Sequence, residues 1–187
     1  MNNCIYVKEN AVSDEVCDTL IESFHKNSWL HRSGAHSESE VNTSKKASTD
    51  ATLCFEQRLE DELPFVEALQ KSLESWVKEC PGLYEQDSFG ICAYHNLQWY
   101  KPGEGYHQPH CEWTTAEEST VKRMGAWMFY LNDVKDGGGT EFPHQEFTAQ
   151  PKRGTLVCFP AQWTHYHKGI VAPKEDKYIL TGWFIAQ

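Results

Sequence analysis

The segment GYHQPHCEW, residues 105–113, holds the side chains of this sequence that are best suited to chemistry. Two histidines, a cysteine and a glutamate stand there between aromatic residues. Three interpretations are open for such a cluster: a metal site, a cysteine nucleophile with a histidine base, or polar groups buried in a core. The spacing of the four residues helps to separate these interpretations.

His110 and Glu112 are two residues apart, and on a β-strand such residues point to the same face. An imidazole nitrogen and a carboxylate oxygen would then reach one metal ion side by side. Cys111, between them, would point to the opposite face and away from His110. The spacing therefore favours a metal site, and Cys111 is expected to be a packed thiol rather than a nucleophile.

Further metal-ligand candidates lie in FPAQWTHYHKG, where His165 and His167 are also two residues apart. Either histidine could join the first pair. Two histidines and one carboxylate form the facial triad of non-haem Fe(II) oxygenases, which leaves coordination positions open. The bare pattern is weak, because nine histidines in 187 residues produce such spacings by chance.

The first half of the chain predicts two amphipathic helices that could support such a site. Ser13 is a good N-cap for the first helix, and Pro64 suits the first position of the second, which Pro81 and Gly82 should end. The apolar stripes at helical spacing are Val16, Leu20, Ile21 and Phe24 in the first helix, and Phe65, Leu69, Leu73 and Trp76 in the second.

Residues 31–50 separate the two helices and are almost entirely polar. A segment of this composition cannot bury an apolar face, so most of it is expected to be a mobile loop. Long loops in compact domains are often lids or recognition loops, and a tolerated surface insertion is an equally good interpretation.

From about residue 90 the sequence contains short runs rich in aromatic and β-branched residues. Turn signals separate the runs, which is typical of an antiparallel sandwich or barrel. Helices followed by strands predict an α+β fold, with a mainly β core that helices support on one side. The runs are ICAYHNLQWY, GAWMFYLN, GTLVCFP and DKYILTGWFIA.

The composition narrows the class of protein. A length of 187 residues suits one domain with a full core. The net charge of −10 disfavours broad binding to nucleic acid or to an anionic membrane, and no apolar run approaches the length of a membrane span. The sequence starts without a signal-peptide pattern, and its seven scattered cysteines read as free thiols, so a cytoplasmic location is expected.

Ordered motifs in the second half resemble the 2-oxoglutarate/Fe(II)-dependent dioxygenases, specifically the prolyl 4-hydroxylase-like branch. The resemblance is clear from about Leu97 to Phe184 and fainter over VSDEVCDTLI near the N-terminus. It implies a double-stranded β-helix (jelly-roll, cupin-like) in one domain, residues 1–187, with residues 1–90 as helical support and residues 91–187 as the catalytic core. The motifs that carry it are QWYKPGEGYHQPHCE, FYLNDVKDGGGTEF, PKRGTLVCFP and HKGIVAPKEDKYILTGWF.

The resemblance implies an iron site made by His110, Glu112 and His167. Glu112 departs from the family pattern, which has aspartate at this position. His167 is preferred over His165 because Lys177 follows it by ten residues, the family's spacing to the residue that grips the far carboxylate of 2-oxoglutarate. An ammonium in an aromatic strand is costly to bury without an anion, although a lysine at a strand start could also stay in solvent.

Four other residues match the cofactor pocket of this branch. Tyr100 and Tyr130 match pocket tyrosines, although both could be plain core aromatics. Thr140 could line the pocket through its hydroxyl, and Trp183 should pack near the metal. No role is matched by His95, His107, His144 or His165.

The activity implied by the resemblance is hydroxylation of a C–H bond, with release of succinate and CO₂. The cofactors implied are Fe(II), 2-oxoglutarate as co-substrate and O₂, with ascorbate as a further candidate. A peptidyl side chain of the prolyl type is the expected substrate, and a free small molecule such as an amino acid is the alternative. A non-catalytic metal-binding jelly-roll protein is a third hypothesis, which would not need Lys177. The oligomeric state stays open.

Overall fold

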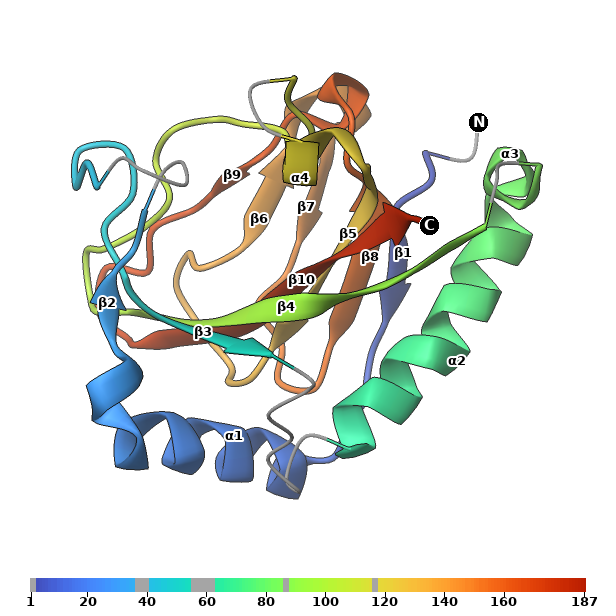
Figure 1. Ribbon diagram of the computed structural model, residues 1–187. Coiled ribbons are helices and arrows are strands. Elements are labelled where there is room, and N and C mark those ends of the chain that lie inside the picture. Colours follow the sequence, from blue (N-terminus) through green and yellow to red (C-terminus); the bar gives the residue numbers. More distant parts are fainter. Residues whose placement is uncertain (1–2, 36–40, 55–62, 86–87, 116–117) are drawn as a thin grey trace.

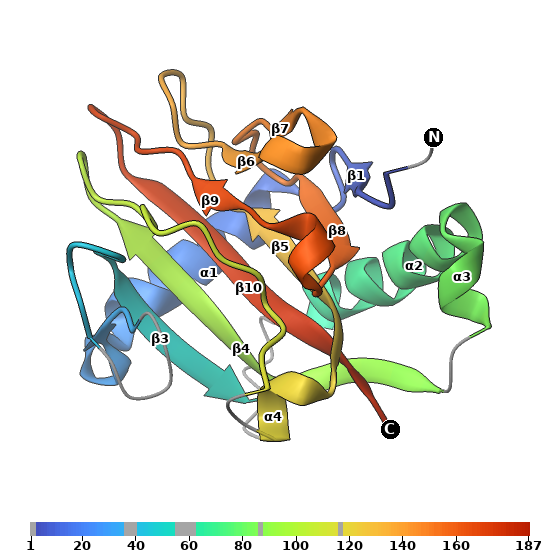
Figure 2. The same cartoon turned by 90° about the horizontal axis from the view of Figure 1, so that it is seen from above.

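The computed structural model describes residues 3–35, 41–54, 63–85, 88–115 and 118–187 (Figure 1). Its centre is a seven-stranded antiparallel sheet in the order β1-β8-β5-β10-β4-β3-β2. A three-stranded sheet in the order β7-β6-β9 lies on one side of it (Figure 2). The strands of the large sheet are β1 (Tyr6–Lys8), β2 (Arg32–Ser33), β3 (Thr49–Cys54), β4 (Phe89–Tyr100), β5 (Arg123–Tyr130), β8 (Leu156–Pro160) and β10 (Lys177–Ala186). The small sheet has β6 (Thr140–Phe142), β7 (Phe147–Ala149) and β9 (Lys168–Gly169).

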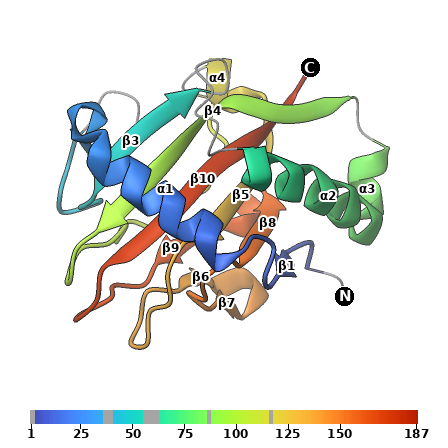
Figure 3. The ribbon, with the colours of Figure 1, turned by 90° about the horizontal axis from the view of Figure 1, so that it is seen from below.

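Two long helices cover the face of the large sheet that lies away from the small sheet (Figure 3). Helix α1 (Asp14–Lys26) begins as predicted, because the Ser13 hydroxyl accepts a hydrogen bond from the Val16 amide at 3.3 Å. Helix α2 (Leu63–Glu79) begins one residue before Pro64. The expected β core supported by helices on one side is confirmed. Shorter helices are α3 (Pro81–Tyr84), α4 (Glu118–Val121), η1 (Ser28–Leu30), η4 (Pro143–Gln145) and η5 (Trp163–His165).

The strands predicted in the second half of the chain are confirmed. Strands β4, β5, β8 and β10 coincide with the four aromatic and β-branched runs. The helices lie mostly in the first half, and none within the described ranges combines the length and the apolar character that a membrane crossing requires.

Side chains alternate across the large sheet and separate two clusters of buried residues. Along β10, Leu180 and Phe184 pack on the helix side, whereas Lys177, Thr181 and Trp183 line a cavity on the other side. Such alternation is the period-two rule of a strand. The site described below therefore lies between the two sheets, and the helices support it from behind.

Within the segment expected to be a mobile loop, residues 31–50, the structure has short strands near both ends, and the mobility stays a prediction. Strand β2 pairs with the start of β3, and Lys46 forms a bridge with Tyr106. The Ala47 amide donates to the Gly105 carbonyl at 2.9 Å, and Lys46 is buried, with an ion pair to Asp50 at 2.6 Å. Backbone hydrogen bonds and this ion pair tie the described residues of the segment to the rest of the fold without an apolar stripe. Residues 36–40 lie outside the described residues.

Gly182 gives a direct test of how β10 is placed in the sheet. A Cβ at this position would lie 2.3 Å from Cζ2 of Trp127, whose side chain is fully buried. Gly182→Ala should therefore lower the free energy of unfolding by about 1–3 kcal/mol, measured by denaturant titration. Gly82→Ala is the matched control, because a Cβ there meets no atom within 4 Å. Equal stability of the two variants would contradict the close packing of the Trp127 ring against Gly182.

Candidate metal centre

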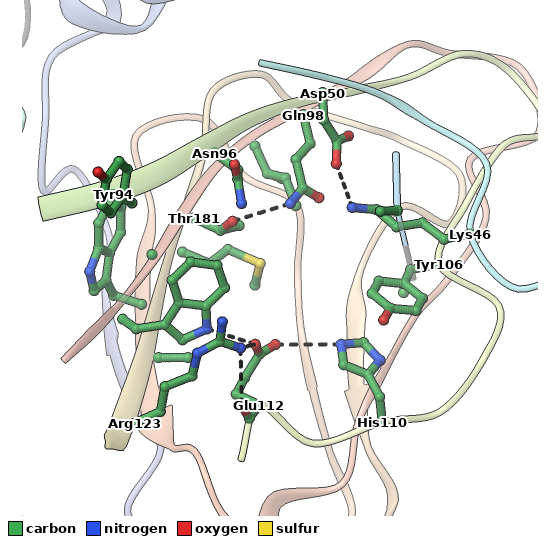
Figure 4. A pocket seen from close by; sticks show the side chains of 18 of the residues that line it. Lys46, Asp50, Tyr94, Asn96, Gln98, Tyr106, His110, Glu112, Arg123 and Thr181 are labelled. Carbon is green, nitrogen blue, oxygen red and sulfur yellow. Dashed lines mark hydrogen bonds and ion pairs between the residues drawn. The ribbon is translucent and has the colours of Figure 1, made fainter. Parts of the chain in front are cut away.

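His110, Glu112 and His167 converge on one point between the two sheets. Oε1 of Glu112 lies 3.4 Å from Nε2 of His110 and 3.5 Å from Nε2 of His167. The three candidate ligand atoms all lie within 4.8 Å of one another. In Figure 4 the side chains of His110 and Glu112 point toward each other. Two imidazole nitrogens and one carboxylate oxygen are thus presented together.

The backbone that positions the triad differs from the expected strand. His110 and His167 form an isolated antiparallel bridge, in which each backbone N–H donates to the other residue's carbonyl at 2.9 Å. Glu112 lies beyond this bridge, and its amide donates to the Ala161 carbonyl at 3.0 Å. The expectation that residues 110–112 form a regular strand is therefore wrong, although Glu112 still reaches the histidines.

Each histidine ring is oriented by a backbone carbonyl. Nδ1 of His110 lies 3.0 Å from the Gln108 carbonyl, and Nδ1 of His167 lies 2.9 Å from the His165 carbonyl. A carbonyl only accepts, so each Nδ1 carries the proton and each Nε2 presents its lone pair to the site. The ring of Tyr106 also stacks on His110, with centroids 3.8 Å apart.

The protonation states suit metal binding. Burial, together with the nearby His167 ring, lowers the pKa of His110. Burial by itself raises the pKa of Glu112, but the two imidazole rings beside its carboxylate hold that pKa well below its usual range. Neutral imidazole and ionised carboxylate are the forms that bind metals.

Cys111 and His165 do not join the triad. The Cys111 thiol donates to the Trp113 carbonyl at 3.1 Å, and burial raises its pKa, which disfavours the nucleophilic thiolate. Nε2 of His165 lies 2.8 Å from the Asn3 carbonyl. His165 belongs to the 3₁₀ helix η5, so the strand rule that placed it beside His167 does not apply.

The triad lies at one wall of a cavity of about 670 Å³. The other sequence-predicted residues that line this cavity are Tyr100, Thr140, Lys177 and Trp183. Tyr130 is fully buried behind the cavity wall, and its hydroxyl donates to Oγ1 of Thr140 at 2.8 Å. Tyr130 thus contacts the cavity through Thr140 rather than directly.

Lys177 is a buried cation within this cavity. Its side chain lies 5.4 Å from the ring centre of Tyr100 and 5.6 Å from that of Tyr130, measured from Nζ. Within the described residues, no carboxylate lies within ion-pair distance of its ammonium. Burial lowers its pKa to about 8. The expectation of a buried lysine thus holds, and the alternative of a solvent-exposed lysine does not.

Several residues that line the cavity were given no role in the sequence analysis. The most informative are Arg123, which contacts Glu112, and Gln98, which accepts a hydrogen bond from the Tyr100 hydroxyl at 2.6 Å. Gln98 could have been found, because it is two residues from Tyr100 on the same strand. Arg123 precedes the apolar run that predicted β5, so the sequence did not predict that Arg123 lies at the start of this strand.

Comparison with known proteins agrees with this geometry. Residues 95–185 match the family model of the 2OG-Fe(II) oxygenase superfamily. The chain is 35% identical over 60 residues to prolyl 4-hydroxylase subunit alpha-1 of Homo sapiens, and as identical over 60 residues to that of Gallus gallus. These matches cover 28% of this chain but only 11% and 12% of the two relatives, so the chain spans a small part of their length.

Solved structures share the fold over nearly the whole chain. The 2OG complex of the viral collagen prolyl hydroxylase from Paramecium Bursaria Chlorella virus-1 has a TM-score of 0.71 and 20% identity, over 98% of this chain and 96% of its own. A Pseudomonas putida prolyl-4-hydroxylase has a TM-score of 0.73 and 14% identity, over 99% and 94%. A Trichoplax adhaerens prolyl hydroxylase, in complex with a hypoxia inducible factor peptide fragment, has a TM-score of 0.75 and 16% identity, over 98% and 84%. The expected double-stranded β-helix is confirmed.

Proposed function

We propose that this chain, of which residues 95–185 match the family model of the 2OG-Fe(II) oxygenase superfamily, is a prolyl 4-hydroxylase-like dioxygenase. It would hydroxylate a C–H bond of a peptidyl, prolyl-type side chain and use Fe(II), 2-oxoglutarate and O₂. The observation that carries the proposal is the presence of Lys177, a buried cation without a carboxylate partner among the described residues, in the same cavity as the His110–Glu112–His167 triad.

The triad fits Fe(II). Two neutral imidazoles and one ionised carboxylate are the donor set of non-haem Fe(II) sites, which keep positions open for other ligands. A structural zinc site is usually closed by four protein ligands. Among the described histidine, cysteine, aspartate and glutamate residues, only three donors gather here. The donor set therefore supports a site that is open on the cavity side.

The far end of the cavity fits a dicarboxylate. The ammonium of Lys177 would hold the carboxylate of 2-oxoglutarate that lies away from the metal, since a buried cation needs an anion nearby. Burial raises the pKa of Tyr100 and Tyr130, so both hydroxyls stay protonated, and they donate to Gln98 and Thr140 on the cavity wall. Thr140 offers a further hydroxyl on the cavity wall.

Bound together, the metal, 2-oxoglutarate and O₂ supply the oxidising power that replaces a C–H hydrogen by hydroxyl, with release of succinate and CO₂. The chain contributes an ordered donor triad, an anion-binding lysine and an apolar wall that limits access of water. Phe159 belongs to that wall and packs 4.8 Å from the ring of His167, centroid to centroid.

A peptide substrate is favoured over a free amino acid. The Trichoplax adhaerens relative was solved with a peptide fragment, and the matched human relative is a prolyl 4-hydroxylase subunit. The cavity also extends to Tyr94, whose side chain is 59% exposed, so it can meet a ligand longer than an amino acid.

A cytoplasmic location is also proposed, supported by the absence of any disulfide among the seven cysteines, all of which lie in the described ranges. The single domain, with its catalytic core beginning at about residue 91, is part of the same proposal.

A screen of proline-containing peptides and free amino acids tests the substrate class. The protein is incubated with Fe(II), 2-oxoglutarate and O₂, and each candidate is read by mass spectrometry for a gain of one oxygen. The expected result is oxygen gain on peptidyl proline that matches succinate in amount and is absent with His110→Ala. Oxygen gain on a free amino acid alone would contradict the peptide substrate. No succinate from any candidate would contradict the enzyme activity.

A further inference from the structure

We propose that Trp183 and Arg123 are positioning residues that hold one oxygen of the Glu112 carboxylate, so that only the other oxygen faces the metal. The inference rests on the proposed metal site and concerns the glutamate itself. Its side chain is longer than aspartate by one methylene, so it has an extra rotatable bond that must be fixed.

The two oxygens of Glu112 have different partners. Oε1 faces Nε2 of both triad histidines, at 3.4 Å and 3.5 Å. Oε2 points the other way and accepts a hydrogen bond from Nε1 of Trp183 at 2.7 Å. A bond of this length from a neutral N–H to a carboxylate is a strong one. A carboxylate held in this way presents a single oxygen to the triad.

Arg123 completes the hold on Glu112. Its Nη1 donates to the Glu112 backbone carbonyl at 3.1 Å and lies 3.7 Å from Oε2. Its guanidinium also covers the Trp183 ring, with Cζ 3.8 Å from the ring centroid. Figure 4 shows Arg123 beside Glu112, on the side away from His110. The indole, the guanidinium and the carboxylate thus contact one another pairwise.

Neighbouring strands bring these two residues together. Trp183 lies on β10 and Arg123 at the start of β5, and the register of this strand pair shifts between Phe184 and Ile185. The side chains of Arg123 and Glu112 are largely buried, at 16% and 18% exposed. Burial strengthens their electrostatic contacts and limits alternative rotamers. The arrangement is therefore suited to orienting a metal ligand, which is the role that outer partners of metal sites play.

Loss of the hold on the Glu112 carboxylate should weaken metal binding, which can be measured without any catalytic turnover. Trp183→Phe keeps an aromatic ring for Arg123 to cover and removes the N–H donor, together with part of the indole. We expect this variant to bind Mn(II) about 10-fold more weakly than the wild type, the lower end of the effect of such partners. Free Mn(II) is followed by electron paramagnetic resonance during titration. The Co(II) absorption spectrum of the variant should also shift, since the carboxylate can rotate and bind through both oxygens.

The same Trp183→Phe substitution, made in a Glu112→Asp variant, separates a positioning role of Trp183 from a general loss of structure. Aspartate is shorter by about 1.5 Å, so in Glu112→Asp a carboxylate that reaches the metal cannot keep its bond to Trp183. Adding Trp183→Phe to Glu112→Asp should then change Mn(II) affinity less than twofold. An equal loss in both backgrounds, or no loss with glutamate present, overturns the inference. His110→Ala is the control for the metal site itself: if it leaves Mn(II) affinity unchanged, the proposed function fails instead.

Discussion

Replacing His167 by alanine should abolish succinate formation, while replacing His165 should leave most of it. His167 presents Nε2 to the triad, 3.5 Å from the Glu112 carboxylate, so its loss removes a metal ligand. Outer partners of metal ligands are commonly worth 10–100-fold in activity, so the loss of a ligand should exceed about 100-fold. Succinate formed per minute at saturating Fe(II) and 2-oxoglutarate is the measurement.

His165→Ala is the matched control, because this histidine is two residues away and equally part of the THYHKG segment. Its ring binds the Asn3 carbonyl and the Thr164 hydroxyl rather than the site. Its loss should therefore cost stability, about 1 kcal/mol in the free energy of unfolding, more than activity. Similar activity losses in the two variants would contradict the assignment of His167 as the distal ligand.

Replacing Lys177 by methionine should raise the 2-oxoglutarate requirement by about 30-fold or more. Removing one partner of a buried charge pair costs about 2–5 kcal/mol, and each 1.4 kcal/mol is tenfold in affinity. The same variant should raise the melting temperature of the protein without 2-oxoglutarate, because it removes a buried ammonium that lacks an anion. The measurements are a 2-oxoglutarate titration and thermal unfolding. An unchanged requirement would remove Lys177 from the co-substrate site.

The pKa of Lys177 adds a pH dependence to this prediction. This pKa is about 8 in the folded protein, against an ordinary value of 10.5 for lysine, so the unfolded state binds more protons between these two pH values. The free energy of unfolding of the wild type should therefore rise relative to that of Lys177→Met from pH 8 to pH 10.5. Affinity for 2-oxoglutarate should fall above pH 8, since only the ammonium attracts its carboxylate. Parallel pH curves for the two proteins would contradict this protonation change.

The elements of the fold were largely predictable because their signals are local. Ser13 and the apolar stripe of α1 lie within a few turns of chain, and the aromatic runs around Trp127 and Leu180 mark the strands on which the cavity is built. The contacts of the polar segment before β3 could not be predicted, because they come from backbone pairing with distant residues and from the buried pair of Lys46 and Asp50. Composition carries no information on such pairing.

The site was predictable in its residues but not in its geometry. The spacing of His110 and Glu112 suggested a shared metal ion, and the family's spacing from His167 to Lys177 completed a set of residues that the structure brings together in one cavity. The bridge between His110 and His167 joins two residues that are 57 positions apart in the sequence (167 − 110). No periodic pattern in the sequence predicts such an isolated contact. The role of Arg123 was not predicted for a similar reason, because it depends on where Trp183 lies in the folded sheet.

The most direct test of the proposed site is the visible absorption of the Fe(II)-loaded protein when 2-oxoglutarate is added without O₂. Metal and co-substrate should bind in one cavity, with the metal at the triad and the dicarboxylate reaching Lys177. We expect a weak charge-transfer band that saturates with 2-oxoglutarate, needs a higher concentration in Lys177→Met, and is absent in His167→Ala. A wild-type protein that retains its Fe(II) but shows no band at high 2-oxoglutarate would contradict the shared site.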